Sequence, residues 1–169
     1  MTGAAIAGLA LAWGFAEATL FFVVVDVLLT AVTVRYGLRA GMTAAGWATA
    51  GAVAGGAAMY RWGVTDPAAV EAALLGLPAI GPEMVARVFS AMSEDWETAL
   101  VGGAFTGVPY KIYAAMAPRL QIDLVPFLVM SVPARLARFA GLVVVASAFS
   151  RVVSLRLGMR GQLVVLALA

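Results

Sequence analysis

Long apolar stretches interrupted by a few ionisable residues run along most of the chain. Residues 3–34 are apolar apart from Glu17 and Asp26. A single helix of this length would measure about 48 Å, which exceeds the ~30 Å hydrocarbon core of a bilayer. The pattern therefore predicts either a spanning helix with an interfacial lead-in or a hairpin that enters and leaves on one side. In both cases the two acids lie at or near membrane depth, unless each caps a helix end at the interface.

Residues 40–60 form the plainest crossing in the sequence. No charge lies between Arg39 and Arg61, and a gap of this length matches one helical crossing. Gly51 and Gly55 repeat at a spacing of four, and small residues at this spacing let helices pack closely in lipid. Tyr60 closes the segment as an interfacial anchor together with its neighbours Arg61 and Trp62.

Residues 63–97 differ in composition, because they hold most of the acidic side chains and fewer apolar runs. Asp66 followed by Pro67 predicts a helix start, with the aspartate as the cap and the proline in the first turn. From Glu83 onward, apolar side chains recur at helical spacing on one side, which indicates an amphipathic segment at the membrane surface. We expect this region to be an extramembrane connector.

Residues 98–150 resemble the first part in plan. Gly107 and Pro109 break an apolar stretch, which predicts a second re-entrant hairpin with a cavity near Pro109 and Lys111, since irregular backbone is tolerated at membrane depth only beside protein or water. Leu124 to Ser150 is long enough to cross again. Four prolines are expected to interrupt the helices between residues 105 and 139, namely Pro109, Pro118, Pro126 and Pro133.

Charged residues within this apolar sequence mark the candidate site. Arg135 and Arg138 lie three residues apart and so share one helix face. A basic side chain at membrane depth costs about 2.5–3.5 kcal/mol on insertion scales, and such residues by default mark a binding site or a transport route. Five arginines and no acids follow residue 123, which favours a cytoplasmic C-terminus for the segment 151–169.

Composition supports an integral membrane protein with one domain. The chain has 169 residues, of which 63% are hydrophobic and 12% charged, and its mean hydropathy is +0.99; soluble domains are far more charged. It has no cysteine and no histidine, so we expect no disulfide, no metal site, no cofactor and no recognisable catalytic set, and hence no enzyme. The basic residues are dispersed, which argues against nucleic acid as a partner.

The sequence thus predicts an all-α membrane fold built from two comparable halves. Residues 1–62 hold the first hairpin and a transmembrane helix, residues 63–97 the connector, residues 98–150 the second hairpin and helix, and residues 151–169 a C-terminal segment. Paired interrupted segments are typical of transporters built from inverted repeats, whose binding site lies between the repeats. We expect two opposed re-entrant hairpins.

Three motifs follow one another between residues 12 and 140. They are Glu17-Ala-Thr-Leu-Phe-Phe-Val-Val-Val-Asp26-Val-Leu-Leu, then Gly51-x-x-x-Gly55-x-x-x-x-Tyr60-x-x-Gly63, and then Phe105-Thr-Gly-Val-Pro109-Tyr-Lys111 followed by Phe127-Leu-x-x-Ser131-x-x-x-Arg135-x-x-Arg138-Phe139. This order and spacing resemble the DedA superfamily, also called the VTT or SNARE-associated Golgi protein domain, and in particular its short bacterial YqaA-like branch. The chain departs from the family where prolines are expected between the first two acids, at Phe21 and Val23.

The resemblance implies two re-entrant hairpins and a role in moving lipids between leaflets of a bacterial cytoplasmic membrane. The lipids implied are polyprenyl phosphates or phospholipids. The family's membrane-embedded acidic pair corresponds to Glu17 and Asp26, which would couple transport to protons. Its essential arginines correspond to Arg135 and Arg138. Lys111 stands where many members carry an arginine, and an ammonium lacks the planar fork with which arginine recognises phosphate.

Several functions are open from the sequence. Lys111, Arg135 and Arg138 would bind a lipid phosphate, and protonation of Glu17 and Asp26 would release the arginines to the headgroup. A flippase or scramblase is the favoured function. The alternatives are a proton-coupled transporter of a small anion or solute and a non-transporting membrane-integrity protein, in which permanent ion pairs merely hold the two hairpins together. Whether the protein forms a homo-oligomer is left open.

Overall fold

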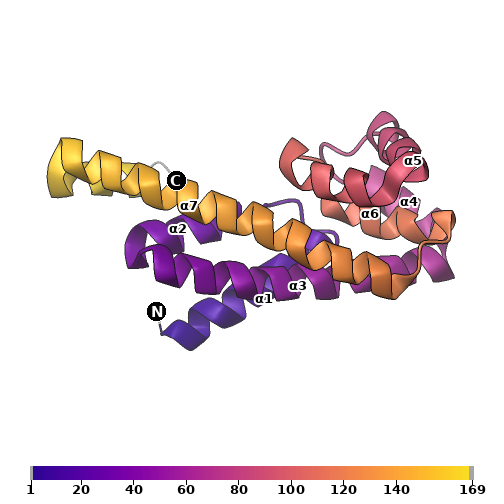
Figure 1. The fold of residues 1–169 in the computed structure, drawn as a ribbon, viewed down its shortest axis with the longest axis horizontal. Coiled ribbons are helices and arrows are strands. Elements are labelled where there is room, and N and C mark those ends of the chain that lie inside the picture. The colour runs from indigo at the N-terminus through magenta and orange to yellow at the C-terminus, as the bar shows by residue number, and fades with distance from the viewer. Residues whose placement is uncertain (1, 168–169) are drawn as a thin grey trace.

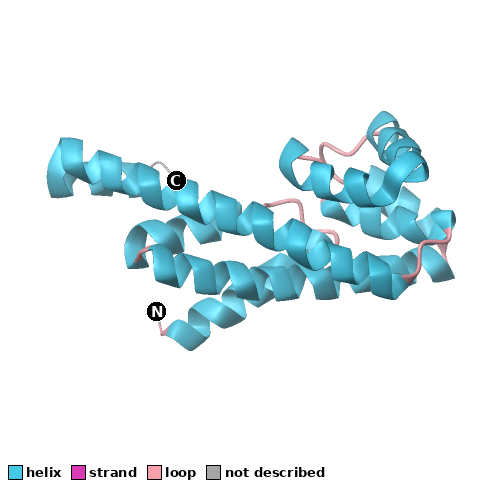
Figure 2. Cartoon of the chain, viewed as in Figure 1, coloured by secondary structure: helices cyan, strands magenta, loops and turns pink. Residues whose placement is uncertain are grey.

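The computed structural model describes the backbone of residues 2–167 and the side chains of residues 2–152. Within these ranges the chain consists of helices and short connections, without strands (Figure 2), which confirms the predicted all-α class. The helices, in chain order, are α1 (Gly3–Ala18), α2 (Asp26–Tyr36), α3 (Leu38–Thr65), α4 (Pro67–Leu75), α5 (Pro82–Thr106), α6 (Tyr110–Met116), a 3₁₀ turn (Ala117–Leu120) and α7 (Leu124–Ala167).

Two long helices, α3 and α7, form the frame of the fold. They run side by side (Figure 1), with α1 and α2 packed along α3 and with α4, α5 and α6 gathered at one end. The hydroxyl of Tyr60 in α3 donates to the carbonyl of Ile122 just before α7, at 2.8 Å, and at the other end of the pair Gly41 lies against Val143. The two frame helices are therefore antiparallel.

Close backbone contact joins α1 to α3. A Cβ atom added to Gly51 would overlap the carbonyl of Leu11, and one added to Gly55 would meet the backbone of Phe15. Because residue numbers rise together along the two helices, α1 and α3 are parallel. The small residues Gly51 and Gly55 of α3 thus pack directly against the backbone of α1. Small residues bring helices together in membranes in the same way.

Residues 3–34 do not form one long helix. The chain leaves α1 at Ala18, runs without regular structure through residues 19–25, and begins α2 at Asp26. The helix ends here without proline, because the Thr19 hydroxyl donates to the carbonyls of Phe15 and Ala16 and the amide of Phe21 also donates to Ala16. These bonds satisfy carbonyls that a helix end leaves free.

The second break lies where the sequence places it. α5 ends at Thr106, Gly107 adopts a left-handed conformation with φ of 80°, and Pro109 precedes the first turn of α6. A residue with a side chain is disfavoured at this φ, so glycine suits the position. Each half of the chain therefore has the order helix, irregular break, short helix, long helix.

The expectation that Pro126 and Pro133 interrupt the last helix is wrong. Pro126 lies in the first turn of α7, where its missing N–H has no intrahelical acceptor. Pro133 lies within the helix, which continues through it. A proline there removes one backbone hydrogen bond and costs about 3 kcal/mol in an isolated helix, but α7 packs against α2, α3 and α5, and these contacts hold it together.

One helix in the described part of the chain is long and apolar enough to cross a membrane, namely α7 over Leu124–Val152. This matches the crossing predicted for residues 124–150. Residues 40–60, expected to be the plainest crossing, lie within α3 but are less apolar than α7, because their glycines, threonines, Trp47 and Tyr60 lower the mean hydropathy that the alanines provide. α1 is apolar but shorter than a crossing.

The connector also differs in detail from its expected boundaries. Asp66 caps α4 by accepting a hydrogen bond from the amide of Ala69, at 2.9 Å, as the Asp-Pro pair predicts. The next helix, α5, passes through the boundary expected at residues 97 and 98 and bends at Asp95, where φ is −155° and ψ is 95°. The segment expected from residue 151 continues α7, and residues 168 and 169 lie outside the described part.

Candidate functional site

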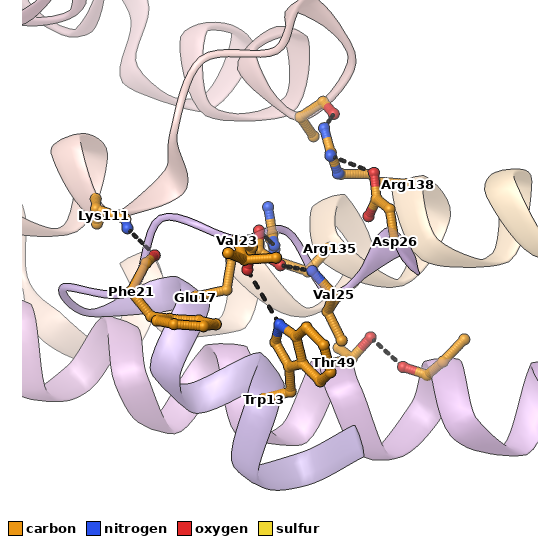
Figure 3. Close-up of polar contacts among 12 residues, drawn as sticks. Trp13, Glu17, Phe21, Val23, Val25, Asp26, Thr49, Lys111, Arg135 and Arg138 are labelled. Carbon is orange, nitrogen blue, oxygen red and sulfur yellow. Dashed lines mark hydrogen bonds and ion pairs between the residues drawn. The ribbon is translucent and has the colours of Figure 1, made fainter. Parts of the chain in front are cut away.

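Five ionisable residues from four helices meet at the two breaks. Glu17 comes from the last turn of α1, Asp26 from the first residue of α2, Lys111 from α6, and Arg135 and Arg138 from successive turns of α7. Figure 3 shows them around the irregular segment between α1 and α2. The structure thus brings together every charged residue that the sequence nominates for the site. We call these five residues the ionic cluster.

The first ion pair of the cluster is almost fully buried. Arg135 Nη2 lies 2.8 Å from Glu17 Oε1, and the two side chains are 4% and 12% exposed. The Arg135 guanidinium also lies over two aromatic rings, 4.5 Å from the ring centre of Phe139 and 5.2 Å from that of Tyr110. Such contacts with ring faces stabilise a cation that has left water. We refer to Glu17–Arg135 as the inner pair.

The second ion pair is more open. Arg138 Nη2 lies 2.8 Å from Asp26 Oδ2, with side chains 20% and 26% exposed. Arg138 Nη1 donates to the carbonyl of Ala104, at 3.0 Å. This side chain therefore links the start of α2 to the last turns of α5. We refer to Asp26–Arg138 as the outer pair.

Lys111 is a buried cation whose hydrogen bond goes to the backbone. The residue is 4% exposed, and its Nζ donates to the carbonyl of Phe21, at 2.7 Å. It belongs to the first turn of α6, so the break at Gly107–Pro109 sets where it points. The bond joins the second break of the chain to the first, 90 residues away.

Side chains of the site hold the segment 19–25 in place. Besides the bond from Lys111, the indole of Trp13 donates to the carbonyl of Val23, at 3.0 Å, and the amide of Val25 donates to Glu17 Oε2, at 2.9 Å (Figure 3). The Glu17 carboxylate therefore makes two contacts: Oε1 pairs with Arg135, and Oε2 accepts the hydrogen bond from the Val25 amide. Buried backbone groups need hydrogen-bond partners, and in this irregular segment side chains provide the partners that a helix would otherwise supply.

Tyr110 and Ser131, to which the sequence analysis assigned no role, support the ionic cluster. Tyr110 stacks on Phe127, with ring centres 6.0 Å apart, and its hydroxyl donates to Ser131 Oγ, at 2.8 Å. Ser131 in turn donates to the carbonyl of Phe127, at 2.7 Å. Both residues lie inside the motifs that resemble the family, which is the signal that would have found them.

A cavity of about 230 Å³ lies beside the cluster. Three connections form its walls: residues 21–24 between α1 and α2, residues 77–80 between α4 and α5, and residues 107–109 before α6. Glu17, Lys111, Arg135 and Arg138 also line it. The sequence predicts a cavity near Pro109 and Lys111, but no local pattern indicates that the loop at residues 77–80 borders it.

The remaining predicted site residues lie outside the cavity or form its wall. Gly51 and Gly55 lie at the contact of α3 with α1, and Tyr60 anchors α3 to the start of α7. Gly107 and Pro109 line the cavity. Within residues 2–152, no group of three or more histidine, cysteine, aspartate or glutamate side chains is placed to hold a metal ion.

The charges around the cavity favour an anionic ligand. The cluster carries two carboxylates and three cationic groups, an excess of one positive formal charge.

Comparison of the chain with protein-family models, with curated proteins and with solved structures gives no significant match. The geometry of the ionic cluster and its cavity is therefore what supports a function.

Proposed function

We propose that this protein is a membrane lipid transporter, a flippase or scramblase that moves lipids with a phosphate headgroup between leaflets. The lipids proposed are polyprenyl phosphates or phospholipids, in the cytoplasmic membrane of a bacterium, as the resemblance to the DedA superfamily implies. The observation that carries the proposal is the ionic cluster, buried at two helix breaks beside a cavity in an otherwise apolar chain.

The outer surface of α7 supports a location in the membrane. Only 28% of the most apolar window of this helix is buried within the protein, whereas the central helix of a soluble domain would be largely covered. Large apolar side chains on the helix are more than half exposed, among them Val125, Val129, Val145 and Phe149. Exposed apolar surface on this scale marks contact with lipid or with another protein.

The two breaks support re-entrant hairpins. In a bilayer, irregular backbone is tolerated only where protein or a water-filled cavity surrounds it. Residues 21–24 and 107–109 both border the same cavity, and Trp13, Glu17 and Lys111 bind the backbone groups that the first break leaves without helical partners. In our proposal α1 with α2 and α5 with α6 are the two hairpins, facing each other across the cavity.

The cationic side chains suit a phosphate group. Hydrogen bonds from arginine to phosphate oxygens are charge-assisted and are among the strongest in proteins. Arg135, Arg138 and Lys111 all reach the cavity wall, and the apolar side chains of Phe21 and Phe22 at the same wall are available to the lipid chains. In this mechanism a headgroup enters the cavity while its chains remain in the bilayer.

Protons would set the direction of transport. Glu17 and Asp26 each hold one of the arginines that a phosphate would need. Protonation of an acid removes its charge and frees the arginine for the headgroup, so that a proton gradient would favour loading on one side.

A small soluble anion is the second candidate ligand, because a cavity of about 230 Å³ is large enough for a phosphate group without lipid chains.

The test is leaflet exchange in liposomes that contain the purified protein, with one fluorescent polyprenyl phosphate and one fluorescent phospholipid. Wild type is compared with Arg138→Gln, and with Arg87→Gln as a control, since the Arg87–Glu83 pair is exposed and neither residue lines the cavity. Exchange that is lost only in Arg138→Gln supports the proposal. Absence of exchange by folded wild-type protein, with and without a proton gradient, contradicts it.

A further inference from the structure

The two ion pairs of the cluster have unequal surroundings. The side chains of the inner pair, Glu17 and Arg135, are 12% and 4% exposed, and those of the outer pair, Asp26 and Arg138, are 26% and 20% exposed. Both pairs have the same separation of 2.8 Å. The difference between them therefore lies in what surrounds each pair.

The inner pair is fixed from several sides. The rings of Phe139 and Tyr110 lie against the Arg135 guanidinium, and the Tyr110 hydroxyl is itself tied to Ser131. The second oxygen of Glu17 binds the amide of Val25. Separation of this pair would leave two unpaired charges in a buried site, which is strongly unfavourable.

The outer pair is held less firmly and is better placed to exchange partners. Arg138 lines the cavity, and Asp26 is not among the lining residues, so a ligand reaches Arg138 without having to occupy the position of the carboxylate. Asp26 Oδ1 and the Nε atoms of both Arg135 and Arg138 are buried without a hydrogen-bond partner among the residues whose side chains are described. The unused donor on Arg138 belongs to the more exposed of the two pairs, so an anion in the cavity would reach it with a smaller rearrangement than it would need at Arg135.

Lys111 adds a second exchangeable cation to the same wall. No carboxylate lies within ion-pair distance of its Nζ in the described structure, and its hydrogen bond goes to the neutral carbonyl of Phe21. A phosphate oxygen is a stronger acceptor for an ammonium than a carbonyl is, because that bond is charge-assisted on both sides.

We infer that the two ion pairs have separate roles, which narrows the mechanism proposed above from both arginines to Arg138 and Lys111. Glu17–Arg135 is a permanent brace that holds the first break of the chain. Arg138 and Lys111 contact the anion, and Asp26 is the counter-ion that the anion displaces from Arg138. The ligand chemistry is a phosphate group, carried by a lipid or free in solution. This inference rests on the proposed function only in taking the ligand of the cavity to be anionic.

The test uses the full-length protein in detergent micelles and two probes, dihexanoyl phosphatidic acid and inorganic phosphate. Affinity is measured by calorimetry for wild type, Asp26→Asn, Arg138→Gln and Lys111→Gln, with Arg87→Gln as the control. We expect Asp26→Asn to tighten binding about tenfold and the two cation variants to weaken it about tenfold or more, the scale of a charge-assisted bond. The thermal unfolding midpoint should fall far more in Glu17→Gln than in Asp26→Asn.

The outcomes separate this inference from the proposed function. Binding of inorganic phosphate alone, with the same order of variants, supports the division of roles but counts against a lipid substrate. Weaker binding in Asp26→Asn, or no binding of either probe by folded wild type, overturns the inference. So does a Glu17→Gln protein that is as stable as wild type. The binding comparison at Asp26 stands even if Glu17→Gln does not fold.

Discussion

Arg135 and Glu17 lie 118 positions apart in the chain, yet a guanidinium nitrogen of one is 2.8 Å from a carboxylate oxygen of the other. The contact joins α7 to the end of α1, and so joins the two halves of the chain at the point where the first half is irregular. Around it the arginine is enclosed by aromatic rings. Its removal therefore affects the fold as well as the site.

Replacement of one member of the inner pair should lower the free energy of unfolding more than replacement of both members. Arg135→Gln leaves the Glu17 carboxylate buried without a cation, and we expect the free energy of unfolding to fall by about 3–5 kcal/mol. The double variant Glu17→Leu with Arg135→Met removes both charges and should recover most of this loss. Unfolding titrations in mixed micelles measure both values; a double variant no more stable than the single one would refute the prediction.

The contact of α1 with α3 should tolerate no side chain at Gly51. Gly51→Ala places a methyl group against the carbonyl of Leu11, which forces the helices apart, and overpacking of this kind costs about 1–3 kcal/mol. Gly46→Ala is the matched control in the same helix, because no atom lies within 4 Å of a Cβ added there. We expect that control to be neutral or to gain up to about 1 kcal/mol, the difference in helix propensity. Equal effects at the two glycines would contradict the packing.

Acid should weaken the hydrogen bonds that Asp95 makes at the bend in α5. The Thr98 hydroxyl, and to a smaller extent the Thr98 amide, donates a hydrogen bond to the Asp95 carboxylate, which lowers the pKa of Asp95 below its ordinary value. A carboxylate with a lowered pKa in the folded state stabilises the protein above the unfolded pKa, and that contribution is lost as the pH falls through the folded pKa. An NMR titration should show the lowered pKa in wild type and a rise towards the ordinary value in Thr98→Ala.

Cysteine labelling should locate α7 relative to the bilayer. The chain has no native cysteine, so single substitutions report cleanly. Val129 and Val145 are exposed on the protein surface, and if lipid covers them Val129→Cys and Val145→Cys should resist a water-soluble maleimide in intact membranes. Both should react after denaturation. Ser93→Cys, in the exposed connector, should react in both conditions; rapid labelling of all three in membranes would exclude a membrane-embedded α7.

Loss of the Trp13 indole should loosen the first break locally. Trp13→Phe removes the donor to the Val23 carbonyl, and a lost hydrogen bond of this kind costs about 1 kcal/mol. Hydrogen exchange followed by mass spectrometry should be faster over residues 19–25 and unchanged over α3. Trp47→Phe serves as the control, because Trp47 lies 45% exposed on α3. Faster exchange throughout the protein would show that Trp13 supports the whole fold instead.

Local features of the sequence determined the type and extent of most helices. The all-α class, the helix start at Asp66-Pro67, the break at Gly107–Pro109 and the long apolar helix from Leu124 all follow from rules that act within a few residues. These rules are the length of an apolar run, the fixed φ of proline and the freedom of glycine. The same rules identified which charged residues lie in apolar surroundings.

Only the tertiary structure decided how those residues are combined. The sequence does not say that Arg135 pairs with Glu17 and Arg138 with Asp26, that Tyr110 and Ser131 support them, or that residues 77–80 border their cavity. It also suggested that Pro133 breaks a helix that in fact continues. The reason is physical: these features depend on packing between segments tens of residues apart, where the sum of many contacts outweighs any local preference.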